Sequence, residues 1–206
     1  DIPMEASITW LTGKVLVVSG QSATAHEAKQ GETLNSMDKI ETEEDGLAEL
    51  TLGNGNVINL KPNSTLTLTQ LTSEAGTGAY VNKFQTDRCK LRAIVEKMGN
   101  SRSTFEIATP TAVAAVRGTI EYLFTDGDTT DVAFFDGTGE VRDPVSGKTT
   151  SVGDGESVHS DRTGGVSDPT VVSDADYESM NSGWDGSDQG DKQTHDPERP
   201  EGSAFR

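Results

Sequence analysis

The chain has 206 residues, of which 32% are hydrophobic and 5% aromatic, so it can build one large domain or two small ones around a slim core. Its formal net charge of −17 excludes nucleic-acid binding by phosphate neutralisation and electrostatic docking on anionic lipid. An acidic balance of this kind instead indicates solubility, cation binding or life in salt.

A single cysteine, Cys89, excludes an intrachain disulfide and any metal site built from several cysteines. We expect it to be a half-buried structural thiol, because no recognisable partner for nucleophilic chemistry accompanies it. No stretch resembles a transmembrane span or the apolar region of a signal peptide, so we expect no membrane insertion. The start at Asp1, without an initiator Met, favours a processed product over a trimmed chain.

Short extended segments separated by turns run through the first 158 residues. Residues 6–18 form two apolar runs hinged at Gly13. The clearest strand pattern covers residues 48–52, and a Gly-Asn-Gly-Asn turn leads from it into residues 57–60, which predicts a hairpin. Residues 72–90 show no clear pattern, and we interpret them as an insertion. Further strands are expected at residues 66–71, 91–95, 105–107, 120–124, 132–135, 140–142 and 152–158.

The densest run of small apolar side chains lies in Thr109–Thr119. Pro110 fixes its own φ and disfavours helix at the residue before it, so the backbone enters this stretch extended. The Ala and Val side chains suit a narrow interior, where Ala115→Leu would overpack, and Gly118 suits a corner between sheet faces. For Arg117, an intrachain pair with a carboxylate is favoured over a partner surface.

Short strands with turn signals about every eight to twelve residues predict an all-β fold, either a twisted β-solenoid or a sandwich-like module. We expect this β domain to cover residues 1–159. From residue 160 onward the chain holds 11 acids against 4 bases and few apolar residues, too few to offset the entropy cost of ordering. Residues 160–206 are therefore expected to form an extended acidic tail, ordered against a partner or a neighbouring subunit.

Four apolar side chains stand out in this tail. They are Val171, Val172, Tyr177 and Trp184. Spaced anchors in a polar segment are typical of a peptide that lies along another subunit. Because the ends of open sheets and solenoids present unpaired backbone to a second chain, these anchors favour self-association.

A series of motifs resembles, in order and spacing, those of a FecR domain. They are Gly13–Val17, Gly31–Leu34, Asp38–Thr42, Ala48–Asn56, Ile58–Ser64, Phe105–Thr119, Phe135–Val141 and Val152–Glu156. The resemblance implies an all-β module exported from the cytoplasm of a bacterium. Its best-known relatives are anti-sigma regulators of iron-siderophore uptake, which receive a signal in the periplasm. Their sigma-binding helices, membrane span and small α/β domain have no counterpart here, so we expect a free-standing exported form.

Two groups of aspartates are the candidates for a cation site, since hard cations such as Ca²⁺ prefer several close oxygens. They are Asp126, Asp128 and Asp131 in one group, and Asp185, Asp188 and Asp191 in the other. Neither group has the spacing of a known calcium loop, so solvated turns are favoured over ligands and no cofactor is expected. The three histidines, His26, His159 and His195, lie in polar segments at unrelated spacings and are expected on the surface.

No nucleophile stands beside a base, so we expect a protein without enzymatic activity. Two functions fit the sequence. The first is an exported structural protein that self-associates at the cell surface or outside the cell, such as a filament subunit whose C-terminal arm clasps the next copy. The alternative is a periplasmic binding or signal-transduction module, as in FecR-like iron-uptake signalling, which recognises an envelope protein or a wall polymer through one sheet face.

Overall fold

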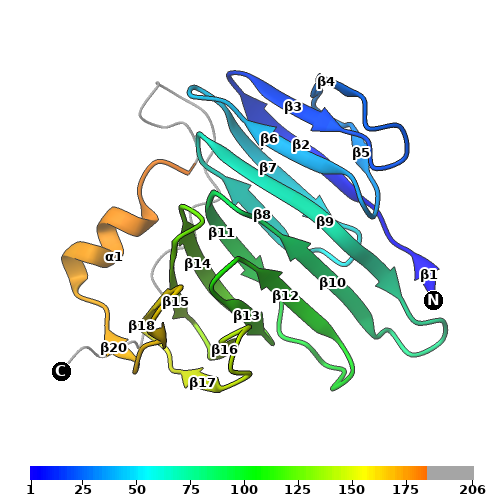
Figure 1. Cartoon of the computed structure of the whole chain (residues 1–206). Helices are drawn as coiled ribbons and strands as arrows, with labels where there is room; N and C mark the ends of the chain where they lie inside the picture. The colour runs from blue at the N-terminus through cyan, green and yellow to red at the C-terminus, as the bar shows by residue number, and fades with distance from the viewer. Residues whose placement is uncertain (185–206) are drawn as a thin grey trace.

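The computed structural model describes residues 1–184, whose strands form two large sheets that enclose the main core (Figure 1). Sheet A contains, in spatial order, β17 (Thr149–Val152), β16 (Gly139–Arg142), β13 (Val113–Val116), β12 (Thr104–Ala108), β10 (Tyr80–Gln85), β9 (Ser64–Ser73), β6 (Lys39–Thr42), β3 (Val15–Val18) and β4 (Ala25–Glu27), with β1 (Ile2–Pro3) beside β9. Sheet B contains β19 (Gly165–Val166), β18 (Glu156–Asp161), β15 (Thr129–Phe135), β14 (Thr119–Thr125), β11 (Cys89–Val95), β8 (Val57–Leu60), β7 (Leu47–Leu52), β2 (Ala6–Thr12) and β5 (Thr33–Leu34), with β20 (Thr170–Val171) beside β18.

The chain passes repeatedly from one sheet to the other. After β6 in sheet A, strands β7 and β8 belong to sheet B, β9 and β10 return to sheet A, and β11 lies again in sheet B. Neighbouring strands run antiparallel, except that β10 and β12 are parallel. These two open sheets confirm the predicted all-β, sandwich-like fold.

The predicted hairpin at residues 48–60 forms in sheet B as β7 and β8, with Leu50 opposite Ile58. Along β7 the side chains of Ala48, Leu50 and Leu52 are buried, while those between them are half-buried. Every second side chain of β7 therefore points into the space between the sheets, and these side chains are the apolar ones. The turn contains Gly55 at a φ of 89°, a conformation that favours glycine.

Residues 72–90 are not an insertion, because they supply β10, a central strand of sheet A between β9 and β12. The inward row of β10 consists of Asn82 and Phe84, both buried. Asn82 obscured the strand pattern in the sequence. Its side-chain oxygen accepts a hydrogen bond from Asn54 Nδ2 at 2.7 Å, while its own Nδ2 has no hydrogen-bond partner among the described residues, so only half of the amide is satisfied in the core.

The small-residue run contributes β13 to sheet A and then crosses to β14 in sheet B. Ala114 and Val116 point inward and are buried, whereas Ala115 is half-buried and lies on the outer face. The interior position for an overpacking substitution is therefore Ala114 and not Ala115. At the crossing, Gly118 has a φ of 115°, and a Cβ atom there would lie 2.5 Å from the backbone of Lys97.

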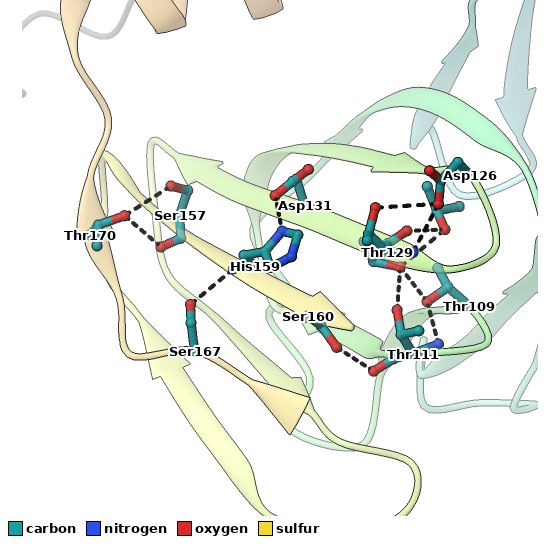
Figure 2. A network of polar contacts seen from close by, with 12 residues as sticks. Thr109, Thr111, Asp126, Thr129, Asp131, Ser157, His159, Ser160, Ser167 and Thr170 are labelled. Atoms are coloured by element: carbon teal, nitrogen blue, oxygen red, sulfur yellow. Dashed lines mark hydrogen bonds and ion pairs between the residues drawn. The ribbon is translucent and has the colours of Figure 1, made fainter. Parts of the chain in front are cut away.

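Buried hydroxyl groups join the turn before β13 to sheet B (Figure 2). Thr130 Oγ1 lies 2.8 Å from the hydroxyls of both Thr109 and Thr111, and Ser160 Oγ donates to the Thr111 carbonyl at 2.6 Å. The Thr109 hydroxyl also accepts the Ala112 N–H at 2.9 Å. Each hydroxyl is hydrogen-bonded, so the polar groups enter the interior without an unpaired donor or acceptor.

Residues 160–184 are not an extended tail. The expected boundary at residue 160 falls inside β18, which pairs with β15, and the chain continues through β19 and β20 into the helix α1 (Asp174–Asn181). Figure 1 shows α1 at the side of the sandwich, near β14 and β15. Residues 185–206 lie outside the described residues, and with them Asp185, Asp188, Asp191 and His195.

A matched pair of substitutions tests the two faces of β13. We expect Ala114→Leu to lower the free energy of unfolding by about 1–3 kcal/mol, because three added carbons enter a filled interior. Ala115→Leu should change it by less than about 0.5 kcal/mol, because this side chain faces outward. Urea unfolding of both variants measures the difference, and equal losses would contradict the placement of β13.

Candidate functional site

The outer face of sheet B is buried around β14, where solvent would otherwise be expected. Leu123 on β14 belongs to the core between the sheets, but Ile120 and Tyr122 on the opposite face are buried as well. They pack in a second apolar cluster with Ala133 and Phe135 of β15. Residues 170–184, which we call the C-terminal strap, cover this cluster and complete it.

The strap folds locally because its sequence contains a helix start. Ser173 is the N-cap of α1, and its Oγ accepts the Asp176 N–H at 3.1 Å. Asp174 and Asp176 place negative charge in the first turn, where it complements the helix dipole. A helix of eight residues is marginal on its own, so packing against sheet B is what stabilises it.

Three of the four predicted partner-contact residues pack on their own chain. Val172, Tyr177 and Trp184 are at most 4% exposed and join the cluster on sheet B, whereas Val171 is 68% exposed. This placement corrects the expectation that the three extend toward a neighbouring subunit. A second copy would first have to displace them from this face.

Trp184 is the strap residue with the most varied surroundings. Its ring stacks on Phe124 at 12° with the ring centroids 6.5 Å apart, and the Tyr122 ring lies 6.0 Å away. Lys61 Nζ lies 4.5 Å and Arg92 Cζ 5.4 Å from the centroid of the indole, within the range of cation–π attraction. The indole Nε1 donates to the Met180 carbonyl at 2.6 Å, so the buried polar edge is also satisfied.

Polar contacts from sheet B hold the C-terminal end of α1. Asn181 Oδ1 accepts from the Tyr122 hydroxyl at 2.5 Å and from Arg92 Nη1 at 3.4 Å. Lys61 Nζ donates to the Ser182 carbonyl at 2.6 Å. The last turn of α1 has no basic residue of its own, so the sheet supplies the positive charge that the negative end of a helix dipole favours.

A row of side chains across sheet B fixes Arg92 in position. Asn59 Oδ1 accepts from Arg92 Nε at 3.3 Å and from Nη2 at 3.2 Å. Asn59 Nδ2 donates to Glu49 Oε2 at 3.1 Å, and Thr9 Oγ1 donates to Glu49 Oε1 at 2.7 Å. The strand register places Arg92 opposite Asn59 and Asn59 opposite Glu49, so the antiparallel pairing itself aligns the row.

Seven residues of sheet B and of the position just after β8 face the strap, and we call them the strip. They are Lys61, Arg92, Ile120, Tyr122, Phe124, Ala133 and Phe135. The strap does not fill the whole space above the strip. A cavity of about 360 Å³ remains, bounded by Phe124, Ser157 and Val171 among others. Its size is at the lower end of the range for ligand pockets.

The candidate cation ligands are engaged in other contacts. Asp126 Oδ1 accepts the N–H groups of Thr129 at 2.8 Å and Asp128 at 3.0 Å, and these bonds lower the pKa of Asp126. Asp128 forms an ion pair with Arg162 at 2.9 Å. Asp131 Oδ1 lies within hydrogen-bond distance of His159 Nδ1, at 2.8 Å (Figure 2). The structure does not gather the three aspartates into a metal site, and within residues 1–184 no other such group occurs.

The remaining singled-out residues lie apart from the strip. Cys89 is fully buried, not half-buried, and burial raises the pKa of its thiol to about 12. His26 is exposed and contacts Glu32. Arg117 Nη2 donates to the Asn100 carbonyl at 3.4 Å, where a carboxylate had been expected, and lines a shallow groove of about 500 Å³ on the outer face of sheet A.

Glu121 is an unusual core residue that the sequence pattern did not reveal. It lies on β14 opposite Ala93 of β11 and Phe134 of β15, is 0% exposed, and neither carboxylate oxygen has a hydrogen-bond partner within the described residues. Burial raises its pKa from 4.5 to about 8. The protonated form is therefore the one that the core accepts at neutral pH.

Comparisons with known proteins identify the class. Residues 38–139 match the family described as FecR protein. Two crystal structures of a candidate anti-sigma factor from Parabacteroides distasonis ATCC 8503 are similar, with TM-scores of 0.54 and 0.53. The sequence identity is 17% in each case, and the similar region covers 65% of this chain and 59% of each solved chain. At this identity, the likeness shows a shared fold. A comparison with curated proteins gave no match.

The chain therefore carries a FecR domain, as its motifs predicted. The matched residues include all seven residues of the strip, whereas the strap lies beyond them. Among residues 1–184, no helix is both long and apolar enough to span a membrane.

Trp184→Ala tests whether the strap is held mainly by its aromatic anchor. Losing the indole contacts should raise hydrogen exchange at the Val172 and Tyr177 amides at least tenfold, while the inter-sheet core stays protected. Hydrogen–deuterium exchange read by NMR measures this. Trp10→Ala, which changes the other tryptophan, should leave both amides as they are; unchanged exchange in Trp184→Ala would contradict the assignment.

Glu121 makes stability depend on pH. The folded-state pKa of about 8 lies above the unfolded value of 4.5, so the contribution of Glu121 to stability is full below pH 4.5 and is lost as pH rises toward 8, because the unfolded chain ionises first. Urea unfolding between pH 5 and pH 8.5 should show the wild type losing stability relative to Glu121→Gln by a few kcal/mol, at about 1.4 kcal/mol per pKa unit. If the stabilities of the wild type and of Glu121→Gln change with pH in parallel, the Glu121 carboxyl is solvated and the prediction is wrong.

Proposed function

We propose that the chain is an exported, non-enzymatic recognition module of the FecR class that transmits a signal by binding a protein partner in the bacterial envelope. The strip on sheet B is the surface that would take the partner. The observation that carries the proposal is the fixed cationic and aromatic arrangement around Arg92, Lys61 and Tyr122, which already holds a peptide segment of this chain.

The geometry of the strip favours a peptide over a polymer of the wall. Peptide segments are recognised by apolar pockets for side chains together with polar groups that fix the backbone ends. The strip has both, in the buried aromatic cluster and in the bonds from Lys61 and Arg92. The groove beside Arg117 on sheet A is shallow and mixed in character, so it fits a specific partner less well.

Two further observations support a binding role without catalysis. The solved structures that share the fold are described as those of a candidate anti-sigma factor, which is a regulatory class. Within this chain, the cysteine thiol is buried with a raised pKa, so it is poorly suited to nucleophilic attack.

Self-association is a second candidate, because the same strip would accept the strap of another copy. Val171 leaves an apolar side chain exposed at the margin of the strap, and exchange of straps between copies would link them head to tail. Repeated exchange gives a filament, and one reciprocal exchange gives a dimer. Size-exclusion chromatography at increasing concentration distinguishes these assemblies from a monomer, whose elution would not change.

Photo-crosslinking tests the two candidates together. A benzoylphenylalanine placed at Val171, beside the cavity, should yield a discrete crosslink to a different protein in an envelope extract of the bacterium that encodes the chain. The matched control is the same substitution at Val145, which is 90% exposed and lies between β16 and β17 of sheet A. Crosslinks only between copies would favour self-association, and equal products at both positions would contradict a specific surface.

A further inference from the structure

We propose that the strip is a receptor for the C-terminal end of a short helix, and that the strap occludes it in cis until a partner helix displaces α1. This inference rests on the proposed function and adds the chemistry of the partner and the means of regulation. The partner would present a short helix that carries one aromatic side chain and has no basic residue in its last turn, followed by a second aromatic side chain seven residues after the first and just beyond the helix end.

The first reason is that the cations of the strip meet a helix end. Lys61 donates to the carbonyl of Ser182, the C-cap of α1, and Arg92 donates to the side chain of Asn181, the last residue of α1. Carbonyls at a helix end lack intrahelical donors, so the Lys61 contact favours a segment whose helix ends at this point. The row from Thr9 through Glu49 and Asn59 keeps Arg92 oriented for this contact.

The second reason is the spacing of the aromatic contacts. Tyr177 packs on Phe135 with ring centroids 4.7 Å apart, while Trp184, seven residues later, lies against Tyr122 and Phe124. Two anchors at this separation fix both the position and the direction of the segment. A partner segment needs the same pair of anchors, one on its helix and one just after it, to use the same cluster.

The third reason is that the strap is an incomplete occupant. The cavity of about 360 Å³ beside Phe124 and Ser157 is left open, and Val171 next to it remains exposed. Of the eight residues of α1, Tyr177 is the fully buried one. A segment with few buried contacts opens locally more readily than the core, and a partner that fills the cavity gains contacts that the strap lacks.

Displacement must compete with a tethered ligand. A short tether gives the strap an effective concentration in the millimolar range, so a free helix of equal quality occupies the strip only when present at similar concentration or when the strap is weakened. A partner with better contacts would overcome this advantage. The tether therefore sets a threshold that distinguishes a specific partner from other helices.

The test uses the full chain and a fluorescent synthetic peptide of residues 170–184. Fluorescence anisotropy should show at least tenfold tighter peptide binding to Tyr177→Ala than to the wild type, because the weakened strap vacates the strip. Adding Lys61→Gln to Tyr177→Ala should weaken binding at least fivefold. Adding Lys83→Gln instead, which removes a lysine from sheet A, should have no effect.

Equal peptide binding to the wild type and to Tyr177→Ala, or equal effects of the two lysine substitutions, would overturn the proposal. If Tyr177→Ala fails to fold, the wild type labelled with 5-fluorotryptophan provides a second measurement. Several millimolar unlabelled peptide should shift the ¹⁹F signal of Trp184 but not that of Trp10, and no shift of Trp184 would overturn displacement.

The peptide experiment is independent of any partner in the cell. Binding as expected, with Val171 crosslinked to a different protein, supports both the receptor and the proposed function. If the peptide binds as expected but Val171 crosslinks only between copies, the strip is a receptor for the strap of a second copy, and the proposal of a different protein partner is overturned. Loss of peptide binding alone overturns the helix receptor and leaves the recognition role of the module standing.

Discussion

The structure depends on β14 being buried on both faces. Leu123 on one face packs into the core between the sheets, and Tyr122 on the other packs beneath the C-terminal strap. A strand with apolar side chains on both faces cannot leave either of them to solvent without a cost of roughly 25 cal/mol for each Å² of apolar surface. The strap is therefore the cover that sheet B requires, and whatever replaces the strap has to be equally apolar underneath.

Two positively charged side chains of the strip hold the strap in place. The chain carries a net charge of −17, yet Lys61 and Arg92 converge on one tryptophan and one helix end. Arg92 is buried and Lys61 is half-buried, and a cation removed from water is favourable only with partners. Here the indole face, the helix carbonyl end and the Asn59 amide are those partners. The contacts combine apolar burial with directional polar groups, which is the arrangement that gives a peptide-binding surface its specificity. The switchable recognition that we propose rests on this surface, which lies on the FecR domain, and on the strap, which lies outside the matched residues.

Much of the fold could be predicted from local patterns. The alternation at residues 48–52, the glycine turn after it and the crossing at Gly118 follow from short-range chemistry, and the family resemblance agrees with the match at residues 38–139. The alternation of Ile120 and Tyr122 was visible as a strand, but the burial of this outer face depends on the strap, which folds back from 50 residues later. Glu121 went unnoticed because a carboxylate normally marks the solvent side.

Only the strap half of the site could be recognised in the sequence. Val172, Tyr177 and Trp184 were recognisable as anchors, since apolar residues in a polar segment need a surface, but no local pattern says whether that surface belongs to the same chain. Lys61, Arg92 and Asn59 were not found, because Arg92 lies on β11 and only sheet pairing brings it beside β8, which contains Asn59 and ends just before Lys61. The most direct measurement of the central claim is an isotope-filtered NOE experiment on a mixture of labelled and unlabelled chains. Intrachain NOEs between the Trp184 indole and the Tyr122 ring are predicted; their absence, or NOEs seen only between different chains, would contradict a strap that closes on its own sheet.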